Sequence, residues 1–293
     1  MHEAIWDWEH LATGVREIAA HLEGRISVQV VDSLTGRTWD WEGQERCPSA
    51  SVIKLAIAWE AFREAEAALL HLDETVSIPP GAAVGGTGVL QLLSPRLSLT
   101  WRDLVTLMLV VSDNTATNLL IDRLGFDAIN ATARSLGLTQ TVLQRKMMDF
   151  AARASGRENY MSAADAARLL AMLAAGAHRQ DDASSGGQEA RLSPDSGKEL
   201  LAILERQQFN HKLPALLPPV RCAHKTGELP GLEHDAGIVY LPAKKGNGNA
   251  SAAGKPAGLV GSADVPVVVV VFTWGLRSNA DGARAIAEVA RAV

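Results

Sequence analysis

Ser51 and Lys54 stand three residues apart at the start of an apolar stretch, ASVIKLAIAWEAF (50–62). Residues at i and i+3 share one face of a helix, so the hydroxyl and the amine are predicted to lie side by side on its first turn. A serine hydroxyl needs a neighbouring base to act as a nucleophile. A lysine supplies that base when desolvation or a nearby cation lowers its pKa. The spacing predicts covalent catalysis at Ser51, although alone it also fits a surface lysine.

Two further polar groups of residues accompany this pair. The tripeptide SDN (112–114) interrupts an apolar helix that is predicted to begin at Thr100, and such short polar residues favour a turn between two helices. The tripeptide KTG (225–227) lies in a strand-like segment, where Gly227 is expected to let a substrate approach the backbone closely. Each tripeptide is common, but all three motifs in this order are specific.

The elements that must position these residues follow from the hydrophobic periodicity. Strands are predicted at both ends of the chain and helices between them. A sheet formed by the two ends of the chain (1–68 and 212–293), an inserted all-α lobe (69–211) and a cleft between them are therefore expected. The predicted segments are a hairpin from 25 to 43, helices from 100 to 111 and from about 163 to 176, a polar loop from 178 to 197, strands at 221–227, 234–241 and 265–274, a long hairpin loop at 243–258 and a helix from about 281 to 293.

Composition narrows the class of protein. The chain has 293 residues and a formal net charge of −5, so nothing indicates a nucleic-acid partner. The longest apolar run, at 265–274, is far shorter than the roughly 20 residues that span a bilayer. The acidic N-terminus does not resemble a signal peptide, so the chain is cytoplasmic as written or has lost an export signal. Two cysteines, Cys47 and Cys222, indicate neither a disulfide framework nor a zinc site.

The three motifs and the flanking LTWRDLVTLMLVVSDNTATNLL (99–120) resemble the class A β-lactamase and penicillin-binding superfamily of serine hydrolases over nearly the whole chain. The resemblance implies an α+β fold with an antiparallel sheet of about five strands. It also implies that Ser51 is acylated, that Lys54 takes its proton and that Ser112 relays a proton to the leaving nitrogen. The backbone N–H groups of Ser51 and Glu228 would form the oxyanion hole.

The same resemblance assigns the substrate-binding residues. Asn114 would hold the amide side chain of the substrate, and Lys225 and Thr226, with Gly227 beside them, would bind its carboxylate. The expected substrate is a small-molecule β-lactam, peptide or ester. No metal or organic cofactor, no nucleic acid and no membrane partner is implied, and a monomer is expected. Members of this superfamily are usually periplasmic or secreted in bacteria.

The chain departs from the family pattern in the loop that follows SDN. Class A enzymes carry a glutamate there, which activates the water that deacylates the serine. When Arg145 and Asn159 are matched to the two ends of that loop, the position of the glutamate falls on Met147. The position of the asparagine that helps to hold the water falls on Ala151. Both polar groups are therefore predicted to be missing.

Two carboxylates near this position are alternative bases. Asp149 is the nearer and Glu158 the more distant, although Asp149 also fits a loop cap or a salt bridge. We therefore expect a β-lactamase-like hydrolase in which acylation survives and deacylation is slow or uses a different base. A D,D-peptidase-like or esterase-like enzyme is the alternative. A penicillin-recognising sensor that is acylated once without turnover is the second alternative.

Overall fold

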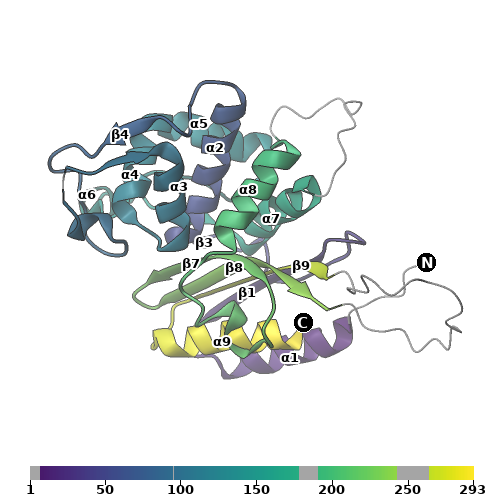
Figure 1. The fold of residues 1–293 in the computed structure, drawn as a ribbon. Coiled ribbons are helices and arrows are strands. Elements are labelled where there is room, and N and C mark those ends of the chain that lie inside the picture. Colours follow the sequence, from purple (N-terminus) through teal and green to yellow (C-terminus); the bar gives the residue numbers. More distant parts are fainter. Residues whose placement is uncertain (1–6, 95, 178–190, 243–263) are drawn as a thin grey trace, which may run out of the picture.

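The computed structural model describes residues 7–94, 96–177, 191–242 and 264–293, and its centre is one antiparallel sheet (Figure 1). The strand order β2-β1-β9-β8-β7 alternates between the two ends of the chain. The predicted fold class is therefore confirmed. The strands are β1 (Arg25–Asp32), β2 (Thr38–Trp41), β7 (Cys222–Leu229), β8 (Leu232–Leu241) and β9 (Val265–Trp274).

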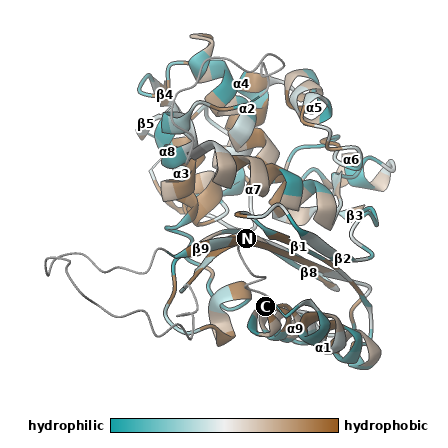
Figure 2. Cartoon of the chain, turned by 90° about the vertical axis from the view of Figure 1, so that its right-hand side faces the viewer, coloured by the Kyte–Doolittle hydropathy of each residue, from teal (hydrophilic) through white to brown (hydrophobic). Residues whose placement is uncertain are grey.

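Helices cover both faces of the sheet. α1 (Trp8–His21) and α9 (Asn279–Ala292) lie side by side on one face, and the remaining helices lie on the other (Figure 1). Strands β8 and β9 are buried along almost their whole length because both faces are covered, which explains their continuous apolar sequence. Successive side chains of β9 enter opposite cores: Val268, Val270 and Phe272 face the larger helical side, and Val267, Val269 and Val271 face α1 and α9. Figure 2 shows the hydrophobic colouring of these central strands.

The larger helical side contains most of the middle of the chain. The helix predicted to begin at Thr100 is α3, and Thr100 and Asp103 form a capping box at its start. The helices are α2 (Lys54–Glu66), α3 (Trp101–Val110), α4 (Asn114–Leu124), α5 (Phe126–Ser135), α6 (Phe150–Ala154), α7 (Ala163–Ala177) and α8 (Pro194–Leu204). The 3₁₀ turns are η1 (Ala50–Ile53), η2 (Leu90–Leu92) and η3 (Leu213–Leu216), and two small sheets pair β3 (Cys47–Pro48) with β6 (Tyr160–Met161) and β4 (Thr75–Ser77) with β5 (Ser98–Thr100).

Two details differ from the expected elements. The predicted loop at 178–197 extends too far, because α8 begins at Pro194 with Ser193 as its cap. α2 was assigned with the sheet region, yet it packs against α3, α4 and α5. The division into two lobes itself stays a prediction.

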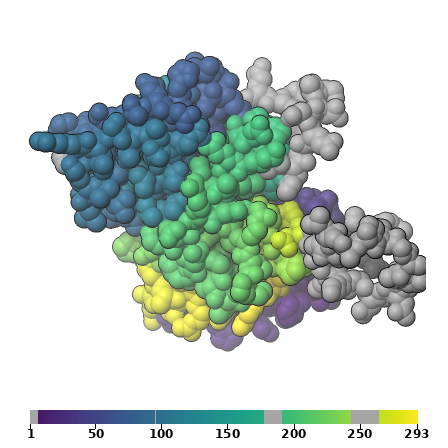
Figure 3. All heavy atoms as spheres, viewed as in Figure 1, coloured from purple at the N-terminus to yellow at the C-terminus, as the bar shows by residue number. Residues whose placement is uncertain are grey.

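In the space-filling view, the green surface that begins at α8 runs without a break from the helical side to the sheet side (Figure 3). The predicted hairpin loop at 243–258 lies outside the described residues.

Candidate active site

Ser51 lies in the 3₁₀ turn η1, where the chain turns sharply into α2. Ala50, the preceding residue, has a positive φ of 43°, which is a strained conformation for a residue with a side chain. The neighbouring Val52 and Ile53 are buried and fix the turn, whereas Ser51 is only half-buried. Within the described part of the chain, no group hydrogen-bonds to its hydroxyl. Ser51 is therefore held on a rigid turn with its hydroxyl unoccupied, although that turn is a 3₁₀ turn and not the first turn of an α-helix.

Lys54 begins α2 and is fully buried. Its Nζ lies 2.8 Å from the Ser112 carbonyl oxygen, 3.1 Å from Ser112 Oγ and 2.9 Å from Asn114 Oδ1. Burial is the main cause that lowers the pKa of Lys54 well below its ordinary value, and the charge of Lys225 adds to the effect. A lowered pKa favours the neutral amine, which is the form that accepts a proton.

The SDN turn joins α3 to α4. Ser112 has a positive φ of 54°, and the turn is held by the buried carboxylate of Asp113. Asp113 caps α4 and accepts hydrogen bonds from the N–H groups of Val89 at 2.7 Å and Leu90 at 2.8 Å. A side chain at Gly88 would collide with this carboxylate. The turn that carries Ser112 is therefore clamped by a segment of chain about 25 residues upstream.

This upstream segment, residues 84–90, is named the strap here. Asn114 donates its side-chain N–H to the Gly85 carbonyl oxygen at 3.1 Å and its backbone N–H to Thr87 O at 3.1 Å. A Cβ at Gly86 would lie 2.6 Å from Asn114 Nδ2 and 3.0 Å from Met148 Sδ. Sequence reasoning missed the strap, although its cluster of three glycines at 85, 86 and 88 was the available signal.

The KTG motif lies on β7, one of the two edge strands of the five-stranded sheet. Lys225 is fully buried, and its Nζ lies 3.1 Å from Ser112 Oγ. Burial, followed by the nearby charge of Lys212, lowers the pKa of Lys225 to about 7. A Cβ at Gly227 would lie 3.1 Å from Val52 Cγ2 and 3.2 Å from Ala50 Cβ. Gly227 therefore lets β7 approach η1 closely, and its predicted role toward a substrate stays a prediction.

The structure brings most of the predicted residues into one cluster. Ser112 Oγ is the meeting point, because the amines of Lys54 and Lys225 both lie 3.1 Å from it. Asn114 joins the cluster through Lys54, and η1 carries Ser51 to the same place beside β7. Thr226 is nearly buried and Glu228 is exposed further along the strand. The structure thus places the hydroxyl of Ser112 between the amines of Lys54 and Lys225, and η1, which carries Ser51, packs against β7.

The loop from Arg145 to Asn159 closes on itself. Asn159 Oδ1 accepts hydrogen bonds from the N–H groups of Gln144 at 2.7 Å and Arg145 at 3.0 Å, and its Nδ2 donates to Arg145 O at 3.0 Å. Arg145 also forms a buried ion pair with Glu158. Asn159 O accepts from Ser49 N at 2.8 Å, so the loop is attached to the segment that enters η1. Because Glu158 is committed to Arg145, it is a poor candidate for a catalytic base.

The two candidate positions for the deacylating group lie within this loop. Met147 is buried, and Asn118 binds both its N–H at 2.8 Å and its carbonyl oxygen at 3.1 Å. Asp149 caps α6, because its Oδ1 accepts from Ala152 N at 2.9 Å. The capping explanation for Asp149 therefore has a direct structural basis. That Met147 occupies the position of the family glutamate stays a prediction.

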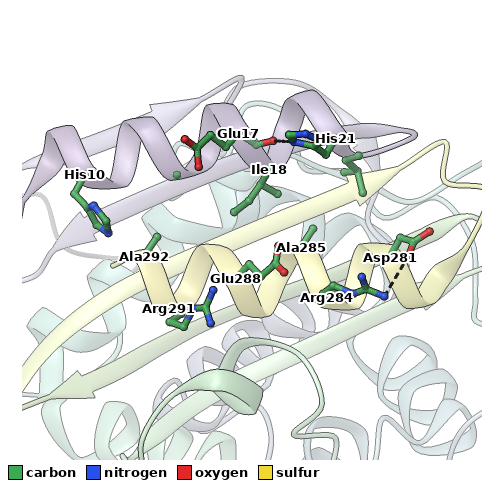
Figure 4. A pocket seen from close by; sticks show the side chains of 12 residues that line it. His10, Glu17, Ile18, His21, Asp281, Arg284, Ala285, Glu288, Arg291 and Ala292 are labelled. Atoms are coloured by element: carbon green, nitrogen blue, oxygen red, sulfur yellow. Dashed lines mark hydrogen bonds and ion pairs between the residues drawn. The ribbon is translucent and has the colours of Figure 1, made fainter.

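Outside the cluster around Ser112 Oγ, the described residues include a possible metal-binding group, a groove and two cysteines. Among the described residues, His211, Glu228 and Glu233 have possible metal-ligand atoms within 4.8 Å of one another, but Glu233 already forms an ion pair with Lys212. A groove between α1 and α9 is lined by both charged and apolar residues and lies on the face of the sheet opposite to η1 and α2 (Figure 4). Cys47 and Cys222 are free thiols. No helix in the ranges that the structure describes has the length and apolar character to cross a membrane.

The five-stranded antiparallel sheet, the helices on its two faces and a serine–lysine pair beside a second serine and a second lysine define a class of protein: the serine hydrolases that include class A β-lactamases and penicillin-binding proteins. A family model described as the β-lactamase enzyme family matches residues 10–247, and the chain belongs to that family. The predicted family resemblance is therefore confirmed.

Individual relatives agree with this assignment. The crystal structure of a β-lactamase from Sphaerobacter thermophilus DSM 20745 is 31% identical, with a TM-score of 0.80 over 98% of this chain and 95% of that chain. The structure of PBP-A is 25% identical, with a TM-score of 0.78 over 96% of this chain and 93% of that chain. β-Lactamase AER-1 of Aeromonas hydrophila is 32% identical over 142 residues, which are 48% of this chain and 46% of AER-1. The chain thus matches about half the length of such curated relatives.

Proposed function

We propose that this protein is a serine hydrolase of β-lactamase type whose Ser51 is acylated by a β-lactam or by a related amide or ester. The observation that supports it most directly is the position of Ser112 Oγ, 3.1 Å from both Lys54 Nζ and Lys225 Nζ. The relatives named as β-lactamases support the same class of substrate. A single chain carries all residues of the proposed site.

Acylation starts at the hydroxyl of Ser51. Neutral Lys54 takes its proton while the oxygen forms a bond to the carbonyl carbon of the substrate. The negative charge of the tetrahedral intermediate is stabilised by the backbone N–H groups of Ser51 and Glu228. The C–N bond then breaks and Ser112 gives its proton to the leaving nitrogen, while Lys54 returns its proton to Ser112. Ser112 can do this because both lysines approach its oxygen and leave its hydrogen free to point at the substrate.

Substrate binding uses the other members of the cluster. Protonated Lys225, with the hydroxyl of Thr226, pairs with the substrate carboxylate, and Asn114 hydrogen-bonds to the amide of the acyl side chain. Lys225, Thr226 and Asn114 are buried, which strengthens their interactions with the substrate because little water competes for them. The pKa of Lys225 is about 7, so carboxylate binding should weaken as pH rises through that value.

Deacylation is the weak step of the proposed cycle. Met147 is buried, and its thioether side chain cannot act as a general base. The Asp149 carboxylate caps α6, because its Oδ1 accepts a hydrogen bond from Ala152 N. Loss of a positioned base costs roughly 10²- to 10⁴-fold in the step that it serves. We therefore propose that the acyl-enzyme at Ser51 is long-lived, or that its hydrolysis relies on a base other than the family glutamate.

The test follows the acyl-enzyme by intact mass spectrometry after addition of penicillin G. A mass increase equal to one penicillin, absent in Ser51→Ala and strongly slowed in Lys54→Met, is expected. Rapid hydrolysis of the drug without any observable adduct would disprove slow deacylation. Hydrolysis that persists in Ser51→Ala would show that the nucleophile is a different residue.

The second candidate function is that of a D,D-peptidase-like or esterase-like penicillin-binding enzyme. It is favoured by the missing carboxylate at Met147 and by the similarity to the structure of PBP-A. Turnover of a D-Ala-D-Ala peptide and of a p-nitrophenyl ester, measured beside a chromogenic cephalosporin, separates the two functions. Stoichiometric labelling by penicillin without turnover of any of these substrates would instead favour a sensor.

A further inference from the structure

Lys212 is a third buried lysine, which the proposed acylation chemistry does not use. It lies just before η3 and has no exposed surface. Its Nζ donates to the Gly227 carbonyl oxygen at 3.0 Å and to His234 O at 3.4 Å, and it forms an ion pair with the buried carboxylate of Glu233. A buried ammonium needs such partners, because desolvation otherwise costs several kcal/mol. One of its three partners belongs to the KTG motif.

The partners of Lys212 are themselves fixed from other elements. Asn279, at the start of α9, donates to Glu233 Oε1 at 2.7 Å and to Leu229 O at 2.9 Å. Leu213, the residue after Lys212, donates its N–H to Asp235 Oδ2 at 3.1 Å. The ammonium is thus held at one position between η3, β7, β8 and α9. These contacts keep the Lys212 ammonium away from the cluster around Ser112 Oγ, where the substrate is proposed to bind.

We propose that Lys212 is a positioning residue for carboxylate recognition: it fixes the Gly227 carbonyl group, which orients the KTG segment of β7, and it places a second positive charge behind Lys225. This inference rests on the proposed function, because it concerns how the same site binds the carboxylate of its substrate. Lys212 acts through Lys225 and the backbone, and it does not touch the substrate.

The charges around Lys225 support an electrostatic effect of Lys212. Lys54 faces Lys225 across Ser112, and Asp235 on β8 carries the opposing negative charge, which is itself bound to His224. Lys212 is the strongest charged influence on Lys225 and lowers its pKa, and Asp235 raises it. The charge of Lys212 is in turn partly balanced by Glu233. Removal of Lys212 should therefore keep Lys225 protonated to a higher pH.

The main test removes both charges of the buried pair with the double variant Lys212→Met/Glu233→Gln, because removal of one partner alone strands a buried charge. The rate of Ser51 acylation is measured against pH from 5.5 to 9.5 with penicillin G, whose carboxylate needs Lys225. We expect the alkaline limb of the profile to move up by half a pH unit or more. The apparent substrate affinity at pH 6 should fall about 3- to 10-fold, because Gly227 O has lost its partner.

Two further variants separate the two contributions. Lys212→Gln/Glu233→Gln keeps an N–H donor for Gly227 O but removes both charges of the pair, so the alkaline limb should move while affinity at pH 6 stays near that of the wild type. Lys212→Arg keeps the charge, so its alkaline limb should stay in place. A neutral p-nitrophenyl ester is the control substrate, since its acylation should show no shift in this limb with any variant. These readouts distinguish the proposal from a purely structural role, which would change the rates at all pH values alike.

Unchanged affinity and an unchanged alkaline limb in the folded double variant would overturn the proposal. If Lys212→Met/Glu233→Gln does not fold, the profile of Lys212→Gln/Glu233→Gln decides: an alkaline limb that coincides with that of the wild type overturns the electrostatic part. Failure of penicillin G to acylate the wild-type protein at any pH would instead refute the proposed function. The two failures are therefore distinguishable in one set of measurements.

Discussion

Replacement of Met147 by glutamate should convert a slow deacylation into a fast one. Met147 is 8% exposed, and Asn118 holds its backbone at both the N–H and the carbonyl oxygen. The new side chain would therefore leave the loop from a fixed position and in a fixed direction. Burial should raise the pKa of the introduced carboxyl, which brings it closer to the value that suits a general base.

The size of the effect follows from the change of chemistry at this one position. A positioned general base accelerates its step by roughly 10² to 10⁴, so the lifetime of the acyl-enzyme should shorten by about that factor. The same substitution exchanges a buried apolar side chain for a polar one, which should lower the free energy of unfolding by about 2–3 kcal/mol. The variant should thus be a less stable protein with a faster catalytic cycle.

The assay forms the acyl-enzyme with a short pulse of penicillin G and follows the loss of the adduct by intact mass spectrometry. Met147→Gln is the matched control, because it has the same shape and polarity as the glutamate variant but no basic carboxylate. Adduct lifetimes that agree between the glutamate and glutamine variants would refute the reasoning. Rapid deacylation of the wild type itself would also refute it.

Three further predictions concern the surroundings of the site. Asp149→Ala should remove the cap of α6 and lower the free energy of unfolding by about 0.5–2 kcal/mol without slowing deacylation; a 100-fold longer acyl-enzyme lifetime would instead identify Asp149 as the base. Gly88→Ala should lower both the melting temperature and the acylation rate, because the residue has a φ of 111° and its side chain would meet Asp113; a fully active, equally stable variant would exclude the clamp. His234 is buried with its pKa lowered to about 4, so the unfolded chain binds this proton more readily and stability should fall by about 3 kcal/mol as pH drops from 6.5 to 4; urea unfolding of His234→Gln should lack this component.

The cluster around Ser112 Oγ was largely predictable from the sequence, because several of its members are polar residues in strongly apolar surroundings. Lys54 and the SDN turn interrupt helical stripes, and such interruptions remain in folded proteins where neighbouring groups compensate them. The antiparallel sheet followed from alternating or β-branched segments such as 265–274. The exact helical type at Ser51 did not follow, since one turn of 3₁₀ and one of α-helix share nearly the same spacing.

Features that depend on contacts distant in sequence were not predictable in this way. Lys212 sits in NHKLPALL without a recognisable pattern, and its partners lie on β7 and β8. The strap was missed because its partners, the residues of the SDN turn, lie about 25 residues further along the chain. The two-residue strands β3 and β6 are too short for a hydrophobic period. The start of α8 was missed despite a local signal, a serine followed by proline at the first helical position.

The pairing of β1 with β9 also has a consequence for the synthesis of the protein on the ribosome. Arg25 pairs with Trp274 and Asp32 with Val267, so β1, which is synthesised early, cannot pair with β9 until almost the whole chain has been synthesised. Until that moment the β1–β2 hairpin exposes an open edge to other nascent chains. Closure of such distant pairs is intrinsically slow. Yield in a cell should therefore depend on chaperones that shield this early hairpin during translation.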